Sequence, residues 1–300
     1  MAAEWSSEVW PDWCPGCGNF GILSALKLAL SELGVDRRSF VIVSGIGCSG
    51  KIAHFVRTSG VHTLHGRAIP FASGIKIANP ELKVIVHGGD GDLLGIGMGH
   101  FIALGRRNID VLVVIHNNGV YGLTKGQASP TLGKGLKTKS LVSPNIADPV
   151  NPILLGMMAG YTFLARGYAY NVEHLKSLLK AGLNHKGAGV IEVIQPCPTW
   201  NNVNTPEWVS NNTLYLKEWD PLVNKKEDLV QKMREIVSLE YGYKRPLGVI
   251  LEDNTKETYQ ERITGLNEYY GESPPAKQKI ESEGKPLPIN FERTFGRYLI

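Results

Sequence analysis

The chain has 300 residues, which is enough for one large domain or two small ones with a sizeable core. Hydrophobic residues make up 43% and charged residues 20%, an ordinary globular mix, and no window of about 18 apolar residues predicts a membrane span. The net charge of +4 comes from dispersed Lys and Arg among 28 acids, which argues against a nucleic-acid-binding protein.

The first part of the chain is expected to be irregular. Residues 1–18 carry Cys14 and Cys17 and contain no basic region followed by an apolar run, so we expect no signal peptide and a cytoplasmic, reducing location. Residues 19–33 follow as a predicted amphipathic helix that ends before Gly34. Its apolar side chains recur at spacings of three and four: Phe20, Leu23, Leu26, Leu30 and Leu33.

Apolar strands then alternate with helices. Strands are expected at residues 39–44, 84–87, 111–116, 162–164 and 190–194, and a helix is expected at residues 172–183. This alternation predicts an α/β fold with a mostly parallel sheet and helices on both of its faces. The first three strands enter the polar turns GIGCSG, GGDGD and NNGVYG. Because ligands bind outside the carboxyl ends of such strands, these turns are predicted to form one site.

The character of the sequence changes after Pro198. The following segment is polar and turn-rich, and residues 245–300 are charged and contain five prolines at positions 246, 274, 275, 286 and 288. We therefore predict an extended C-terminal arm that lies over the surface or over a partner chain. The chain is divided into an α/β domain at residues 1–205 and a C-terminal extension at residues 206–300.

The GGDGD and NNGVYG turns carry candidate magnesium ligands. Asp90 offers a carboxylate, Asn118 offers a side-chain carbonyl, and the backbone carbonyl of Val120 can face the same ion. Magnesium prefers about six oxygen ligands and usually keeps substrate phosphates among them. Gly89 and Gly91 allow a sharp bend and a close approach of phosphate to the backbone. This pattern indicates a diphosphate site with a magnesium ion.

The four cysteines form a second candidate centre. Cys14 and Cys17 belong to a Cys-Pro-Gly-Cys loop, Cys48 lies in the GIGCSG turn, and Cys197 follows the last predicted strand. Four thiolates suit either a zinc ion or a [4Fe–4S] cluster, and spacing alone does not decide between them. The position of Cys48 within the predicted cofactor turn favours the redox-active cluster.

The motifs as a set resemble a known family. A Gly-Asp-Gly followed by Asn-Asn at this spacing resembles the thiamine diphosphate signature. CPGCG, GIGCSG, LHGRAIPFASGIKIANP, HGGDGD, NNGVYGLTKGQASPT and QPCPTWN stand in the same order as in the beta subunits of 2-oxoacid:ferredoxin oxidoreductases. The resemblance covers residues 10–205. It implies a pyrophosphate-type thiamine diphosphate-binding domain.

The resemblance also implies roles for individual residues. Magnesium ligands would be Asp90, Asn118 and the Val120 carbonyl, and His65 would contact the diphosphate. The resemblance further implies a [4Fe–4S] cluster on Cys14, Cys17, Cys48 and Cys197. The remaining implied contacts to thiamine diphosphate are Ile46, Gly47, Cys48, Ser49, Gly91, Asp92, Gly122 and Leu123.

The implied reaction is the coenzyme A-dependent oxidative decarboxylation of a 2-oxoacid. Pyruvate, 2-oxobutyrate and 2-oxoglutarate remain open as substrates, and ferredoxin is the implied electron acceptor. The chain has room for only one thiamine-type domain, and the resemblance implies that an alpha subunit supplies the activating glutamate. The alternatives are a non-oxidative thiamine-dependent decarboxylase or carboligase, and a zinc-stapled scaffold subunit.

Three residues are candidates for contact with the substrate. Lys125 and Lys51 are cations that can meet a carboxylate or coenzyme A, and Leu123 is placed where side-chain size affects the choice of oxoacid. A solvated loop lysine is the plainer interpretation of each cation. The same holds for the basic loop with Lys134, Lys137 and Lys139, which can otherwise steer an acidic ferredoxin.

Overall fold

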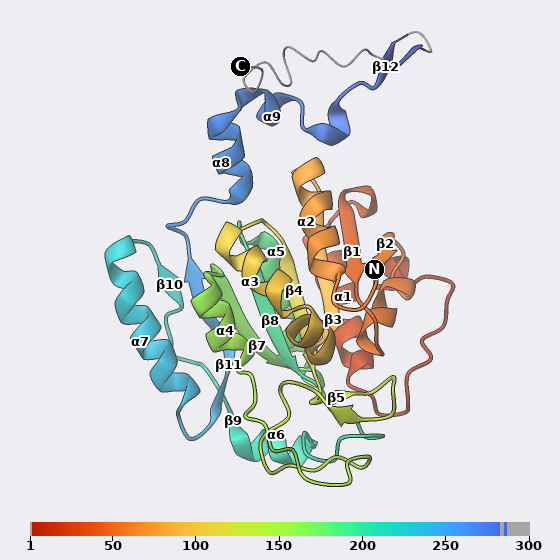
Figure 1. Cartoon of the computed structure of the whole chain (residues 1–300), viewed down its shortest axis with the longest axis vertical. Coiled ribbons are helices and arrows are strands. Elements are labelled where there is room, and N and C mark those ends of the chain that lie inside the picture. Colours follow the sequence, from red (N-terminus) through yellow and green to blue (C-terminus); the bar gives the residue numbers. More distant parts are fainter. Residues whose placement is uncertain (1, 283–284, 287–300) are drawn as a thin grey trace, which may run out of the picture.

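Figure 1 shows a computed structural model of the chain, which describes residues 2–282 and 285–286. Within those residues one nine-stranded sheet has the order β10-β11-β7-β8-β4-β3-β1-β2, with β9 beside β11. The central strands pair in parallel. They are β1 (Phe40–Ser44), β2 (Ser59–His62), β3 (Lys83–Gly89), β4 (Leu112–Asn117), β7 (Phe163–Tyr168) and β8 (Gly189–Ile194). The predicted α/β class with a mostly parallel sheet is confirmed.

One edge of the sheet departs from the prediction. Strand β11 (Arg245–Asp253) pairs antiparallel with β7, so the extended arm predicted from residue 245 was wrong for residues 245–253. Their apolar run buries Leu247 and Ile250 completely. The remaining short strands are β9 (Thr213–Tyr215), β10 (Leu222–Val223), β5 (Val120–Tyr121), β6 (Gln127–Ala128), β12 (Glu281–Ser282) and β13 (Lys285–Pro286).

Helices cover both faces of the sheet (Figure 1). One face carries α1 (Asn19–Leu33) and α5 (Val172–Asn184), and the other carries α2 (Ala68–Ala78), α3 (Met98–Arg107), α4 (Pro152–Ala159) and α7 (Leu229–Glu240). Gly34 ends α1 in the left-handed conformation at φ 61°, which glycine adopts without strain. Asn151 begins α4 by accepting hydrogen bonds from the backbone N–H groups of Ile153 and Leu154.

A hydrophobic core lies on each side of the sheet. Ile42 and Ile85 belong to the core under α1 and α5, whereas Val43 and Val86 belong to the core under α2 and α3. Successive residues of β1 and β3 therefore point to opposite faces of the sheet. Both faces are buried, which explains the uninterrupted apolar runs of these strands. Each fully buried side chain of this size contributes about 1.5–3 kcal/mol to folding.

The end of the described chain lies far from the β5 loop, at the opposite end of the molecule in Figure 1. Helices α8 (Tyr259–Leu266) and α9 (Glu268–Glu272) form this arm, and Tyr270 donates a 2.7 Å hydrogen bond to the Ile77 carbonyl at the end of α2. Part of the predicted arm, residues 283–284 and 287–300, lies outside the described residues. The division at residue 205 stays a prediction; strands from both sides of it pair in one sheet. One short helix, α6 (Pro206–Asn212), follows that boundary.

Among the described helices, none combines the length and the apolar character that a membrane crossing requires.

Candidate active site

A cavity of about 140 Å³ opens at the carboxyl ends of β1, β3 and β4. It brings together the three polar turns that the sequence predicted to converge. Its walls contain all of the residues predicted to contact thiamine diphosphate or magnesium, together with Tyr121 and Thr124, which were not predicted. The lining residues are Ile46, Gly47, Cys48, Ser49, His65, Gly89, Asp90, Gly91, Asp92, Asn118, Val120, Tyr121, Gly122, Leu123 and Thr124.

Asp90 is the most deeply buried acid in this cavity, with 1% of its surface exposed. Its Oδ2 accepts hydrogen bonds from the hydroxyl groups of Ser129 and Thr131, whereas its buried Oδ1 has no hydrogen-bond partner. Burial raises the pKa of Asp90 to about 6, although the two hydroxyl groups act in the opposite direction. A buried carboxylate with an unpartnered oxygen fits a cation, which would supply the missing interaction.

Asn118 and Val120 line the same cavity beside Asp90. The side-chain carbonyl of Asn118 accepts a 3.0 Å hydrogen bond from the Val120 N–H, which folds the turn back on itself. The side-chain amide of Asn201 also supports the turn by donating a hydrogen bond to the backbone carbonyl of Asn118. The three predicted magnesium ligands thus line one cavity, and all of them offer the hard oxygen atoms that magnesium prefers.

Asp92 ties the neighbouring turns together. Its Oδ1 accepts hydrogen bonds from the N–H groups of Ile46 at 3.2 Å and Gly66 at 2.8 Å, and it lies 2.7 Å from Nδ1 of His65. A side chain at Gly45 would place its Cβ 1.8 Å from Asp92 Oδ2, so only glycine fits there. Asp92 therefore holds His65 at the wall of the cavity, and its contact with a diphosphate remains a prediction.

Tyr121 covers the Gly-Asp-Gly turn. A Cβ at Gly91 would lie 2.3 Å from the Tyr121 ring, so the ring packs directly over the glycine backbone. Burial raises the pKa of Tyr121, and the charges of Asp90 and Asp92 raise it further, so the phenol stays neutral. The tyrosine closes one side of the cavity and limits the access of water to the two aspartates.

The four cysteines come from three segments that contact one another. The Cys17 N–H donates to the Cys14 carbonyl at 3.0 Å, and the Trp13 indole donates to the Cys48 carbonyl at 2.6 Å. Burial, with smaller contributions from the charges of Cys197, Cys48 and Cys14, raises the pKa of the Cys17 thiol to about 12. The four thiols thus lie within electrostatic reach of one another.

The described residues include no group of three or more His, Cys, Asp or Glu side chains with the geometry to hold a single metal ion. The four cysteines nevertheless influence one another electrostatically, and Cys14 is exposed whereas Cys17 is buried. Four cysteine thiolates are the ligand set of an iron–sulfur cluster. The identity and coordination geometry of this centre remain predictions.

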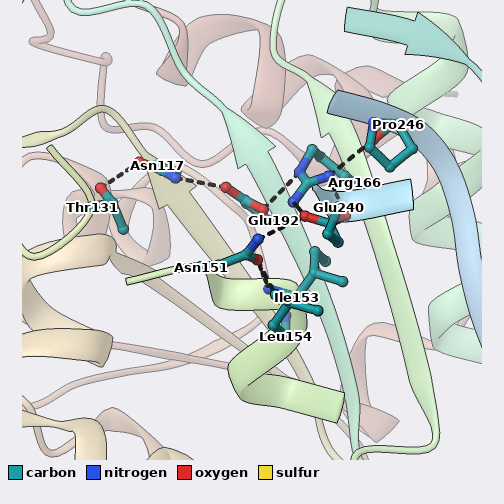
Figure 2. Close-up of polar contacts among 9 residues, drawn as sticks. All are labelled: Asn117, Thr131, Asn151, Ile153, Leu154, Arg166, Glu192, Glu240 and Pro246. Carbon is teal, nitrogen blue, oxygen red and sulfur yellow. Dashed lines mark hydrogen bonds and ion pairs between the residues drawn. The ribbon is translucent and has the colours of Figure 1, made fainter. Parts of the chain in front are cut away.

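A buried polar network extends from Asp90 into the core, and Figure 2 shows its part from Thr131 to Glu240. The Thr131 hydroxyl lies 2.7 Å from the Asn117 side-chain carbonyl, and the Asn117 amide donates to Glu192 at 2.6 Å. Arg166 donates to Glu192 at 2.8 Å and to both oxygens of Glu240 at 2.7 and 2.8 Å. The network therefore joins β4, β8, β7 and α7 behind the cavity.

Arg166 and its two glutamates compensate one another. Burial alone would raise the pKa of Glu192, but the charges of Arg166 and Arg245 and two side-chain hydrogen bonds outweigh it and leave the pKa below its ordinary value. Burial alone would lower the pKa of Arg166, but the charges of Glu192 and Glu240 and their hydrogen bonds outweigh burial and raise it. Arg166 and Glu192 thus remain ionised inside the protein.

The three residues predicted to meet the substrate lie in different environments. Leu123 lines the cavity and has 52% of its surface exposed, so it is placed to contact a bound molecule. Lys51 forms an ion pair with Asp12 at 2.9 Å, and Lys125 is exposed with a left-handed φ of 80°. Neither lysine lines the cavity. A substrate role for these two lysines remains a prediction.

The basic loop packs against the turn of Cys197. Lys139 donates to the Pro198 carbonyl at 2.6 Å, and the buried Thr138 donates to the Gly126 carbonyl at 2.9 Å. Lys134 is paired with Asp148 at 3.3 Å, whereas the described structure pairs Lys137 and Lys139 with no acid. Lys139 therefore lies beside the turn that carries Cys197.

Several important residues were not predicted. Ser129 and Thr131 lie in the GQASPT segment, where hydroxyl groups are common and no spacing marks a contact with Asp90. Arg166 and Glu192 were detectable in principle, because each is a single charge inside an otherwise apolar strand. Such a charge requires a buried partner, which is a usable signal of a polar network.

Comparison with known proteins decides the family. The thiamine pyrophosphate enzyme C-terminal binding domain matches residues 45–193, and the C-terminal part of the pyruvate ferredoxin oxidoreductase beta subunit matches residues 197–268. A 2-oxoacid:ferredoxin oxidoreductase subunit beta from Sulfolobus sp is 59% identical over 93% of this chain and 94% of that protein. The chain belongs to this family of beta subunits.

Two further relatives support the assignment. Subunit beta of 2-oxoacid:ferredoxin oxidoreductase 1 from Aeropyrum pernix is 53% identical over 99% of this chain and 96% of that protein. A solved 2-oxoglutarate:ferredoxin oxidoreductase from Magnetococcus marinus, with 2-oxoglutarate, coenzyme A and succinyl-CoA bound, has a TM-score of 0.85 and 31% identity, covering 99% and 95% of the two chains. This beta subunit is therefore part of an oxidoreductase with at least one further subunit, and it contains a thiamine pyrophosphate-binding domain.

Proposed function

We propose that this beta subunit holds thiamine diphosphate through a magnesium ion and passes electrons from a 2-oxoacid through a [4Fe–4S] cluster to ferredoxin. The observation that carries the proposal is the buried, unpartnered Oδ1 of Asp90 in a cavity shared with Asn118 and Cys48. One cavity thus combines oxygen ligands for magnesium with a sulfur from the cysteine centre.

The cofactor-binding part of the proposal rests on chain residues that fit it. Asp90, Asn118 and the Val120 carbonyl would hold magnesium, and His65 would donate a hydrogen bond to the diphosphate. Ile46 and Ser49 would border the thiamine ring from the GIGCSG turn. When bound, thiamine diphosphate supplies the electron sink that allows carbon dioxide to leave the 2-oxoacid.

The electron path is proposed to begin at Cys48. This residue lines the cavity and lies within electrostatic reach of Cys14 and Cys197, so it connects the two centres. The proposed overall reaction converts a 2-oxoacid and coenzyme A into acyl-CoA, carbon dioxide and a proton. The two electrons released pass singly to two oxidised ferredoxins. The open substrates are pyruvate, 2-oxobutyrate and 2-oxoglutarate, the last being bound in the Magnetococcus relative.

An alpha subunit is proposed to complete the site. Three large apolar side chains near His65 are exposed to solvent. Leu64 and Phe71 follow or precede it within six residues of the sequence and have 74% and 53% of their surface exposed, and Ile96 has 60% exposed. Gly66, next to His65, packs against Ile96. Such exposed apolar surface favours coverage by another chain. The partner would contribute the glutamate that activates thiamine, because the described cavity wall contains none.

The experiment is anaerobic purification of this subunit with its alpha partner, followed by assays with each 2-oxoacid, coenzyme A and ferredoxin. The proposal predicts acyl-CoA and reduced ferredoxin in a ratio of one to two, and no turnover by the beta subunit alone. Non-oxidative release of carbon dioxide without ferredoxin reduction would support a thiamine-dependent decarboxylase instead. Stoichiometric zinc with neither iron nor thiamine would support a scaffold subunit.

A further inference from the structure

Gln195 lies between the cofactor cavity and the cysteine centre. It directly follows β8, and its backbone N–H donates to the Asn117 carbonyl at the end of β4 at 2.9 Å. Its side chain is 1% exposed, and its amide Nε2 donates a hydrogen bond to Cys17 Sγ at 3.3 Å. A buried amide thus connects the strand that leads to the magnesium ligands with a sulfur of the cysteine centre.

The surrounding backbone limits the movement of this side chain. A Cβ at Gly18 would lie 2.7 Å from Gln195 Cγ, so the amide stem packs directly on the glycine. The Gly18 N–H also donates to the Pro196 carbonyl at 3.1 Å, which fixes the cysteine loop against the segment that carries Gln195. The Nε2 group is therefore held facing Cys17.

The carbonyl oxygen of the Gln195 amide accepts no hydrogen bond within the described structure. Gln195 Oε1 is buried and has no hydrogen-bond partner. An unsatisfied buried carbonyl destabilises the folded state, whereas an apolar side chain of similar size would not. Among the residues that the structure describes, the hydrogen bond to sulfur is the only polar contact of the Gln195 side chain, which indicates that the contact with Cys17 is the reason for an amide here.

We propose that Gln195 raises the reduction potential of the iron–sulfur cluster by donating its amide N–H to the Cys17 thiolate. Reduction by one electron, which comes from the substrate and leaves to ferredoxin, adds one negative charge to the cluster and its sulfurs. A donor aimed at a ligating sulfur stabilises that added charge, so the reduced state is favoured. This inference rests on the proposed cluster, and Gln195 acts as a positioning and tuning residue.

Two neighbouring donors differ from Gln195 in their acceptor. The Trp13 indole donates to the backbone carbonyl of Cys48, and the Tyr170 hydroxyl donates to the backbone carbonyl of Gly16. Both contacts support the cysteine loops without reaching a sulfur. Tyr170→Phe therefore offers a matched control, because it removes a hydrogen bond next to the centre and leaves the contact from Gln195 to Cys17 in place.

The test is a redox titration of the holo-complex, followed by the EPR signal of the reduced cluster. Gln195→Met keeps the length of the side chain and removes the donor, and Gln195→Leu removes it with a different shape. Both variants should retain iron and show a midpoint potential more negative than the wild type. Tyr170→Phe should keep the wild-type potential. Thermal unfolding should change little in all three variants.

The outcomes separate this inference from the proposed function. A wild-type complex without iron would refute the cluster itself. Iron-loaded Gln195→Met and Gln195→Leu complexes with the wild-type potential would refute tuning by Gln195 and leave the cluster intact. Loss of iron in both Gln195 variants, with full iron in Tyr170→Phe, would make the amide an assembly requirement and would equally overturn tuning.

Discussion

Two buried carboxylates of one polar network, Asp90 and Glu192, have opposite electrostatics, and Figure 2 shows the part of the network around Glu192. Glu192 has both oxygens hydrogen-bonded and a charged partner in Arg166, and its pKa is lowered. Asp90, reached through Thr131 and Asn117, has one oxygen without a partner, and burial raises its pKa to about 6. A buried charge that the chain neutralises serves the fold, whereas one that it leaves unneutralised marks a binding site.

The largest expected effect tests the Asp90 end of this comparison. Asp90→Ala should abolish magnesium-dependent thiamine diphosphate binding and lower activity by a thousandfold or more, on the order of several kcal/mol. The apoprotein should be no less stable, because the variant removes a poorly compensated buried acid. Calorimetric titration with magnesium and thiamine diphosphate measures the binding. Tight binding by Asp90→Ala would show that Asp90 is not a ligand.

Arg166→Met tests the Glu192 side of this comparison. It leaves Glu192 and Glu240 buried without their cation, so the free energy of unfolding should fall by about 3–5 kcal/mol. Denaturant unfolding measures the loss. The triple variant Arg166→Met, Glu192→Gln, Glu240→Gln should recover much of it, because no uncompensated charge remains. An unchanged stability in Arg166→Met would contradict the interpretation of the network as a compensated ion triad.

The pH dependence follows from the raised pKa of Asp90. Folding favours its protonated form, so this contribution to apoprotein stability is complete below the ordinary value of 3.8 and is lost as the pH rises through about 6. Magnesium binds the ionised form, so the gain in Tm on adding magnesium and thiamine diphosphate should increase between about pH 5 and about pH 7. Asp90→Asn should remove this pH dependence. A gain independent of pH in the wild type would exclude control by Asp90.

Thr131 lies between Asp90 and Asn117 in the network, and its replacement should have the smallest effect on magnesium binding. Thr131→Val removes a hydrogen bond to the Asp90 carboxylate and should weaken magnesium affinity about 10–100-fold. Thr131→Ser retains the hydroxyl and should restore most of the affinity. Titrations of both variants provide the comparison. Equal affinities in the two variants would show that the hydroxyl does not support the ligand.

The sequence predicted β1, β3, β4, β7 and β8 because their apolar runs are local patterns, whereas β2, which is mostly exposed, was not predicted. It predicted Asp90 and Asn118 for the same reason, since each directly follows a strand. Strand β11 was missed because its partner β7 is distant in the chain and Pro246 opens a charged segment. Thr131 was missed because its contact with Asp90 depends on how a long loop folds back, which no local spacing encodes.

The central claim is that Cys48 joins the thiamine cavity to an electron-accepting cluster. The most direct measurement mixes the anaerobic complex with a 2-oxoacid and coenzyme A and follows the bleaching of the cluster absorption, in wild type and in Cys48→Ser. The account predicts bleaching in the wild type, and in Cys48→Ser it predicts no bleaching and no ferredoxin reduction despite bound thiamine diphosphate. Equal bleaching and full ferredoxin reduction in Cys48→Ser would contradict it.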